Sequence, residues 1–309
     1  MIAVEEMLYV RYQAPDLDAM EHFLTHFGLH RTERTDKRLY MRAAGRSPVV
    51  HVTELGEAKS VGYGLAAQSR ADLDVLARAT GQPVQAREEP GGGSVVRLTD
   101  PAGYRVDVVW GIEPVTALYV PPPLPFNAVH SGSRCNQPVR RGMHPSNVAR
   151  LGHVAAKTPD LAASIRFYQD LLGFRIADEF VTSEGKRAGV FMRCGLGQRF
   201  TDHHTMALLG HPSPGFDHAG FEVPDWDDLM GGHYHLMSQP SIKHSWGVGR
   251  HNEGSNLFDY WCDPWGHKLE HWADMDRVND DYRGGSEVLR LDGVALRQWA
   301  PAFDPKFFE

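Results

Sequence analysis

Hydrophobic positions recur in the same order in two separate parts of the chain. Residues 8–29, LYVRYQAPDLDAMEHFLTHFGL, and residues 152–174, GHVAAKTPDLAASIRFYQDLLGF, each begin with a strand-like run and continue into a Pro-Asp-Leu helix start. Asp16 and Asp160 stand at the expected N-cap positions, where an aspartate accepts hydrogen bonds from free helix amides. The predicted helices carry apolar stripes of Leu17, Met20, Phe23, Leu24 and Phe27 in the first copy and Leu161, Ile165, Tyr168 and Leu172 in the second.

The two copies also end alike. Residues 98–110, LTDPAGYRVDVVW, and residues 260–272, YWCDPWGHKLEHW, each place an Asp-Pro-x-Gly turn between two strand-like runs. Each copy therefore predicts a strand, a helix and then several strands, so one architectural unit occurs twice.

The remaining segments differ in character from the two copies. A connector that contains VPPPLPF reads as a linker, and a tail that ends in LRQWAPAFDPKFFE carries enough aromatic residues to pack on the body or on a neighbouring subunit. We therefore predict an N-terminal unit, a linker, a C-terminal unit and a tail, with the boundaries 1–111, 112–150, 151–273 and 274–309.

Composition narrows the class of protein. The 309 residues carry a formal net charge of −7 and no basic run longer than Arg140–Arg141, which argues against a nucleic-acid partner. No segment is apolar for long enough to span a bilayer, and the N-terminus MIAVEEMLYV does not resemble a signal peptide, so we expect a cytoplasmic protein without membrane contact. The three cysteines, Cys135, Cys194 and Cys262, share no CxxC spacing and suit a reducing compartment.

Histidine is distributed unevenly, since 13 of the 17 fall between His130 and His271. Comparison of the two copies sharpens this signal, because the second copy has two histidines and a carboxylate where the first has mostly other residues. Aligned on their prolines and turns, the copies pair His153 with Tyr9, Glu270 with Asp107, and His218 with either Gly62 or Tyr63. Because the two copies share a pattern of strands and helix but differ in these polar side chains, the side chains are indicated to have a chemical function rather than a folding role.

His153, His218 and Glu270 lie on three separate predicted strands, and one face of a curved sheet can direct such side chains to a common point. Two imidazoles and one carboxylate on one face of an octahedron are the ligand set of non-haem Fe(II) oxygenases. The same donors also suit zinc with a catalytic water. Taken singly, each histidine is more often a hydrogen-bonded core or rim residue than a ligand, and a lone Glu270 more often faces solvent or pairs with Lys268 or Arg250.

Four blocks resemble, in order and spacing, the motifs of type I extradiol ring-cleavage dioxygenases in the vicinal oxygen chelate superfamily, which includes glyoxalases and bleomycin resistance proteins. They are LGHVAAKTPDLAASIRFYQDLLGF, DHHTMALL, FDHAGFEV and GRHNEGSNLFDYWCDPWGHKLE. The resemblance is close across residues 150–273 and weaker across residues 5–111. It implies an α+β fold of paired βαβββ modules that form two curved, barrel-like mixed sheets, with a degenerate, metal-free first pair.

The resemblance also implies roles for six residues. His153, His218 and Glu270 match the iron ligands, His204 matches the acid–base histidine, and His251 and Tyr260 match residues that hydrogen-bond the substrate. The implied activity is Fe(II)-dependent cleavage of a catechol beside its diol with both atoms of O₂, and Mn(II) suits the same ligands. A small aromatic diol and O₂ are the expected partners, in a homo-oligomer.

Two departures from the family pattern bear on the substrate. The residues after His251 are Asn252, Glu253 and Gly254, where many relatives carry an Asn/Asp pair. Relatives that act on carboxylated catechols have an arginine where this chain has Trp246. The tryptophan favours a substrate with a neutral or aromatic substituent, unless Lys243 or His244 contacts an anionic substituent. The alternatives are a glyoxalase-type isomerase or fosfomycin thiol transferase, both of which commonly take ligands from both copies or a dimer, and a metal-free protein that sequesters aromatic drugs.

Overall fold

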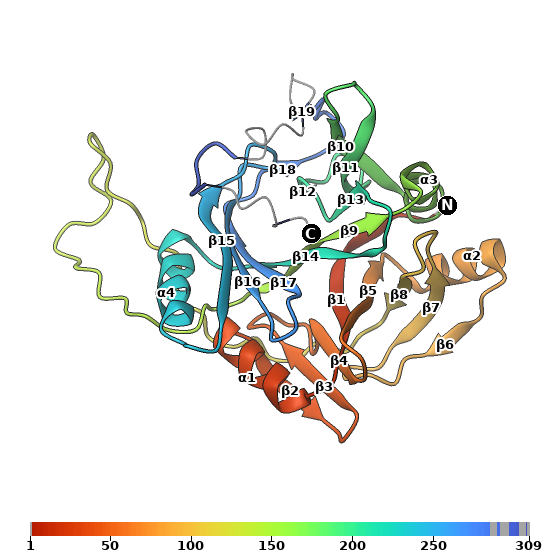
Figure 1. The fold of residues 1–309 in the computed structure, drawn as a ribbon, viewed down its shortest axis with the longest axis horizontal. Helices are drawn as coiled ribbons and strands as arrows, with labels where there is room; N and C mark the ends of the chain where they lie inside the picture. The colour runs from red at the N-terminus through yellow and green to blue at the C-terminus, as the bar shows by residue number, and fades with distance from the viewer. Residues whose placement is uncertain (1, 285–288, 291–296, 303–306, 308–309) are drawn as a thin grey trace.

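The structure is a computed structural model that describes residues 2–284, 289–290, 297–302 and 307 (Figure 1). Within these residues the chain forms two large mixed β-sheets and four α-helices. The two sheets have matching strand orders, so the repeat seen in the sequence is also a repeat in space.

The first sheet has the strand order β2-β3-β4-β1-β5-β8-β7-β6 and consists of two βαβββ modules. The first module contains β1 (Val4–Ala14), α1 (Leu17–Phe27), β2 (His30–Arg34), β3 (Arg38–Arg42) and β4 (His51–Leu55). The second contains β5 (Lys59–Ala67), α2 (Arg70–Thr80), β6 (Val84–Ala86), β7 (Ser94–Thr99) and β8 (Arg105–Trp110).

The second sheet has the order β15-β16-β17-β14-β9-β13-β11-β10-β19. Its first module contains β9 (Arg150–Thr158), α3 (Leu161–Leu172), β10 (Phe174–Val181), β11 (Arg187–Cys194) and β13 (Met206–Gly210). Its second contains β14 (Gly215–Glu222), α4 (Trp226–Met237), β15 (Lys243–Arg250), β16 (Leu257–Cys262) and β17 (Lys268–Ala273). Short strands β12 (Thr201–Asp202) and β18 (Arg277–Val278) pair with each other, and β19 (Leu289–Arg290) lies beside β10. The predicted α+β fold of paired modules is confirmed.

The helix starts follow the sequence prediction. The Asp16 carboxylate accepts hydrogen bonds from the amides of Asp18 and Ala19 at 2.8 and 3.0 Å, and the Asp160 carboxylate accepts one from Ala163 at 2.9 Å. The apolar stripe of α1 is buried throughout, whereas Leu161 in the stripe of α3 is only partly covered.

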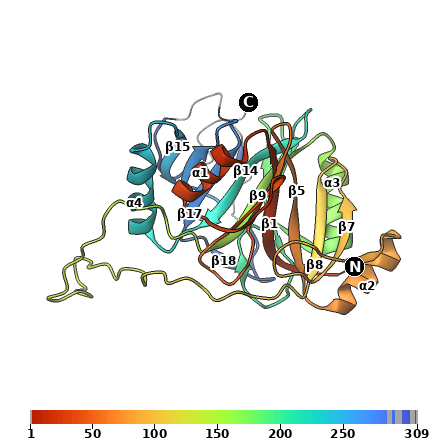
Figure 2. The same ribbon diagram turned by 90° about the horizontal axis from the view of Figure 1, so that it is seen from below.

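Helices α1 and α3 each join the two halves of the molecule (Figure 2). The Phe27 ring at the end of α1 stacks on His271 of β17 with 3.8 Å between ring centroids, and His271 Nε2 donates to the Phe27 carbonyl at 2.7 Å. The Tyr168 hydroxyl in α3 donates to Asp100 of the first half at 2.6 Å and contacts the Tyr63 hydroxyl. One hydrophobic core therefore extends across both halves.

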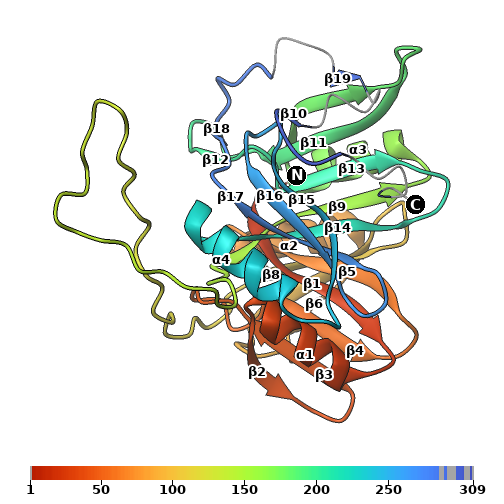
Figure 3. The same ribbon diagram turned by 60° about the vertical axis from the view of Figure 1, so that its left-hand side comes forward.

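Residues 111–149 connect the halves without a helix or strand apart from a single bridge between Ala128 and Ser131. Much of this segment forms a long loop that extends away from both sheets (Figures 1 and 3). No helix in the described part of the chain has the length and apolar character needed to cross a membrane.

Candidate metal centre

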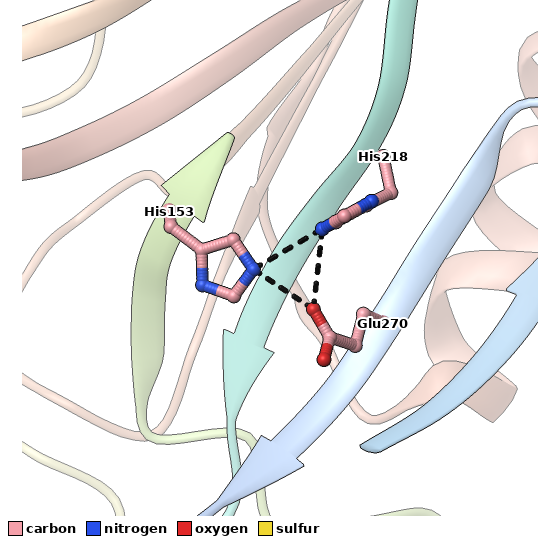
Figure 4. Close-up of side chains that lie close together, drawn as sticks. All are labelled: His153, His218 and Glu270. Carbon is pink, nitrogen blue, oxygen red and sulfur yellow. Dashed lines mark hydrogen bonds and ion pairs between the residues drawn. The ribbon is translucent and has the colours of Figure 1, made fainter. Parts of the chain in front are cut away.

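Three neighbouring strands of the second sheet carry the predicted triad on one face. His153 lies on β9, His218 on β14 and Glu270 on β17, and their side chains point to a common position (Figure 4). In the strand ladder Gly220 lies opposite both His153 and Glu270, and His218, two residues earlier on β14, shares its face. A Cβ atom at Gly220 would lie 2.2 Å from the His153 ring, so glycine makes room for the imidazole.

The three candidate donor atoms are close together. His153 Nε2 lies 2.8 Å from Glu270 Oε2 and 3.3 Å from His218 Nε2, and His218 Nε2 lies 3.4 Å from Glu270 Oε2. Metal–ligand bonds of about 2.1 Å place neighbouring donors about 3.0 Å apart in an octahedron and about 3.4 Å apart in a tetrahedron. The observed spacing therefore suits one small divalent cation bound by nitrogen and oxygen, and it does not select the element.

A second layer of residues orients these donors. Asp217 Oδ2 accepts the Nδ1 proton of His218 at 2.9 Å, which leaves the Nε2 lone pair of His218 free for a cation. The other Asp217 oxygen accepts from Lys268 Nζ at 3.0 Å, and Asn256 Nδ2 donates to Glu270 Oε1 at 3.2 Å. Sequence analysis missed Asp217 and Asn256. Asp217 directly precedes His218, which is the available signal, but its contact depends on a β-bulge between Phe216 and His218.

Burial and neighbouring groups together shift the pKa values of Glu270, His153 and Asp217. Burial acts to raise the pKa of Glu270, but its interactions with His153, including their hydrogen bond, and with His218 outweigh burial and hold that pKa below its usual value. Burial lowers the pKa of His153, which favours a neutral imidazole. Burial opposes ionisation of Asp217 as well, yet hydrogen bonds and charge from His218 and Lys268 lower its pKa to about 2. An ionised carboxylate with neutral imidazoles is the state that binds a metal cation.

The structure also places His204, His251 and Tyr260 around the same cavity as the triad. The His204 ring lies 4.6 Å from the His153 ring, and His251 Nε2 lies 2.9 Å from the Tyr260 hydroxyl. Burial, with the nearby His153 and His203, lowers the pKa of His204 well below its usual value. Burial, with the charge of Glu270, raises the pKa of Tyr260 well above its usual value, so this hydroxyl keeps its proton.

The remaining walls of the cavity are mostly apolar. The apolar wall residues are Ala155, Phe180, Phe191, Ala207, Leu209, Trp246 and Phe307, and the carboxyl group of Glu253 also lines the cavity. Phe307 comes from the C-terminal tail, and its ring lies 5.3 Å from Trp246 and 5.1 Å from Tyr260. The described lining contains no lysine or arginine, and neither Lys243 nor His244 belongs to it.

Comparison with known proteins identifies the family. Residues 150–270 match the model of the Glyoxalase/Bleomycin resistance protein/Dioxygenase superfamily. The chain is 31% identical to Metapyrocatechase 2 of Cupriavidus necator over 99% of its own length and 92% of the relative. The chain belongs to the extradiol dioxygenases. It is therefore an oxidoreductase of the class that incorporates both atoms of O₂.

One further comparison concerns the family and another concerns the fold. The dioxygenase is 33% identical to an iron-dependent extradiol dioxygenase of Rhodococcus jostii (strain RHA1), over 50% of its own length and 51% of the relative. It shares its fold with the Mn(II)-bound glyoxalase from Novosphingobium aromaticivorans at a TM-score of 0.80 and 24% identity, covering all of this chain and 95% of the other.

The first sheet of the dioxygenase contains a counterpart of the triad without its ligands. Gly64 lies opposite Tyr9 and Asp107, as Gly220 lies opposite His153 and Glu270, so Gly62 takes the place of His218. The position between these residues is filled by protein groups. Tyr9 donates to Asp107 at 2.9 Å, and the buried Arg11 guanidinium donates to the same carboxylate at 3.2 Å. An arginine thus supplies the positive charge that a metal would supply.

A second cluster with metal-binding residue types lies elsewhere in the dioxygenase. His233 Nδ1 and His244 Nε2 contact the two oxygens of buried Asp259 at 3.1 and 2.8 Å, and Trp261 Nε1 donates to it at 2.7 Å. Three protein donors satisfy this carboxylate, so the cluster reads as a hydrogen-bond network that links α4 to β15 and β16.

Proposed function

We propose that the protein is an Fe(II)-dependent extradiol dioxygenase that cleaves a catechol beside its diol, with His153, His218 and Glu270 as the metal ligands. The convergence of these three donors within 2.8 to 3.4 Å of one another carries the proposal. Its relatives support it, since one is named metapyrocatechase and another iron-dependent. Mn(II) suits the same donors.

The triad supplies one carboxylate oxygen and two imidazole nitrogens on one side of the site. An Fe(II) ion held there would provide adjacent coordination positions at which a catechol and O₂, which react poorly with each other directly, can exchange electrons. The protein fixes these donors in advance through Asp217, Lys268 and Asn256, which reduces the reorganisation needed when the substrate binds.

We assign the proton transfer to His204. Its buried ring is neutral at rest, so it can accept a proton from a diol hydroxyl group and later return it to an oxygen of the product. Tyr260 remains protonated and can donate a hydrogen bond to a substrate oxygen that gains negative charge. His251, 2.9 Å from the Tyr260 hydroxyl, holds that hydroxyl in place.

The cavity favours catechols with neutral, apolar substituents. Trp246, Phe307 and the phenylalanines of β10 and β11 offer apolar contact, and the described lining has no lysine or arginine to pair with a substrate carboxylate. An anionic substituent would lose its hydration without compensation in such a site. We therefore expect alkyl- or aryl-substituted catechols to be preferred over carboxylated ones.

Anaerobic reconstitution with Fe(II), followed by a panel of catechols in air, tests the proposal. We expect O₂ uptake in step with the absorbance of yellow ring-cleaved products. Turnover of the methylglyoxal–glutathione adduct in place of catechols would establish an isomerase. Tight aromatic binding with neither metal nor turnover would establish sequestration.

The metal donors all come from one sheet, and Arg11 fills the counterpart position, which disfavours a site shared between the two copies. Self-association and a cytoplasmic location stay predictions.

A further inference from the structure

A hydrogen-bonded chain leads from His204 away from the cavity to a buried aspartate. His203 Nδ1 lies 3.1 Å from His204 Nδ1, and His203 Nε2 lies 2.7 Å from Asp178 Oδ2 on β10. The Tyr282 hydroxyl donates to the same Asp178 oxygen at 3.0 Å. The exposed fractions of Asp178, His203 and His204 are 8%, 0% and 4%, so the chain is shielded from bulk water.

The Asp178 carboxylate determines which atoms donate and which accept in this series of hydrogen bonds. An ionised carboxylate can only accept, so the proton of a neutral His203 lies on Nε2, and its Nδ1 carries a lone pair. The 3.1 Å contact then requires the proton of a neutral His204 to lie on Nδ1. This assignment leaves Nε2 of His204 as its free basic atom.

Packing holds both rings in these orientations. The Phe191 ring lies 4.4 Å from the His204 ring and 5.7 Å from the His203 ring. On the other side, Gly254 has φ +72°, and a Cβ atom there would lie 3.1 Å from His203 Nδ1. The loop that follows His251 therefore lies directly against His203, and neither imidazole can turn without displacing a neighbour.

We propose that His203 and Asp178 are positioning residues for the proton transfer carried out by His204. The proposal rests on the proposed function. In the step, a diol O–H bond breaks, its electron pair stays on the oxygen, and an N–H bond forms at His204 Nε2. The imidazolium keeps its Nδ1–H bond to His203, and the Asp178 carboxylate stabilises its positive charge. When Nε2 returns the proton to a product oxygen, His204 is neutral again in the same tautomer.

Substitutions at His203 can separate the two hydrogen bonds of the chain. In H203N an amide oxygen can still accept from His204 Nδ1, in H203Q an amide nitrogen can still donate to Asp178, and H203L provides neither group. D178N keeps an acceptor oxygen and removes the charge. H233N is the matched control, because His233 is also hydrogen-bonded to a buried aspartate, Asp259, but outside the cavity.

Each variant is reconstituted with Fe(II), and bound iron, kcat, KM and the solvent deuterium isotope effect on kcat are measured with the best catechol of the panel. We expect H203L to lose about 10- to 100-fold in kcat with iron content and KM nearly unchanged, and its isotope effect to rise as proton transfer becomes limiting. H203N should recover most of the lost rate and H203Q little of it. D178N should lose about 10-fold, while H233N keeps the wild-type kcat.

Equal kcat in wild type and H203L, or a loss that follows iron content, would overturn the positioning role. Equal losses in H203N and H203Q would do the same, and this comparison decides the matter alone if H203L fails to fold. A wild-type protein that turns over no catechol would instead contradict the proposed function, so the two failures are distinguishable.

Discussion

At the scale of single residues, the cavity combines groups whose protonation is set by burial. His204 is nearly closed from solvent, and its nearest polar neighbours are other histidines, so it is held neutral in the resting protein. This makes it a proton acceptor beside the candidate ligands without a net charge that would repel a cation.

Replacing His204 with phenylalanine should preserve the metal centre and remove the proton transfer. We expect iron content to stay at the wild-type level while kcat falls by about 100-fold or more, since general acid–base catalysis contributes that much. Metal analysis and O₂ uptake of the same sample check this. H130F, a similar substitution at an exposed linker residue, should leave both values unchanged. Loss of iron in H204F would show that His204 supports metal binding instead.

Glu253 is a buried carboxyl group that the metal centre does not use. Neither of its oxygens has a hydrogen-bond partner among the described residues, and burial raises its pKa from 4.5 to about 7. Because the folded protein holds this proton more tightly than the unfolded chain, the free energy of unfolding should fall as pH rises between these two values. The total effect is on the order of 3 kcal/mol, and it is fully present above pH 7.

E253Q should remove this dependence, because glutamine does not ionise. Denaturant unfolding from pH 4 to pH 9 should show E253Q gaining stability relative to wild type as pH rises, with a plateau above pH 7. E184Q, at an exposed glutamate, should show no such trend. A constant difference between E253Q and wild type at every pH would contradict the expectation.

At the scale of elements, strand register explains why three distant residues meet. The ladder places Gly220 of β14 between His153 and Glu270, and the absence of a side chain there opens the space that the His153 ring occupies. A substitution at this glycine therefore acts on the metal centre through a ring that it displaces.

G220A should reduce metal affinity about 10- to 100-fold by displacing His153, and it should cost about 1–3 kcal/mol of stability through overpacking. Metal titration with thermal unfolding measures both effects. G64A is the matched control, since a Cβ atom there would lie 2.4 Å from the Tyr9 ring in the first sheet. It should lower stability without weakening metal binding, and equal loss of affinity in both variants would refute a local effect.

Local patterns predict the elements well and their relative positions poorly. The Pro-Asp-Leu starts and the glycines Gly28 and Gly173 fix both ends of α1 and α3, because capping depends on residues close in sequence. Sequence alone leaves the counterpart of His218 open between Gly62 and Tyr63, since a one-residue shift of register moves a side chain to the other face. Only strand pairing selects Gly62. The contact of His203 with Asp178 joins β10 to a turn near β13, and no spacing rule connects them.

At the scale of the whole molecule, two similar sheets carry different charges at equivalent positions. The second sheet presents a carboxylate and two imidazoles to a shared point, whereas the first pairs Asp107 with the guanidinium groups of Arg11 and Arg105. Within the described residues, no metal-ligating cluster lies in the first sheet.

We therefore expect one metal ion per chain, and the repeat supplies a matched pair of substitutions. E270Q should abolish stoichiometric binding and the rise in melting temperature that the metal produces, because a ligand that binds only the folded state stabilises it. D107N should keep one metal ion per chain while losing about 3–5 kcal/mol of stability, since it weakens the pairing of a buried arginine. Metal analysis and thermal unfolding with and without a chelator check both. A stoichiometry near two, or loss of metal in D107N, would contradict the asymmetry.

The contacts that α1 and α3 make with the opposite half have a practical consequence. The loop within residues 111–149 lies outside the shared core. The two halves contact each other through Phe27 with His271 and through Tyr168. A protease that nicks this loop should leave one particle with its active centre intact. Two polypeptides that are synthesised separately and divided within the loop should likewise associate and form an active enzyme. They should do so although the C-terminal polypeptide alone carries every proposed metal ligand.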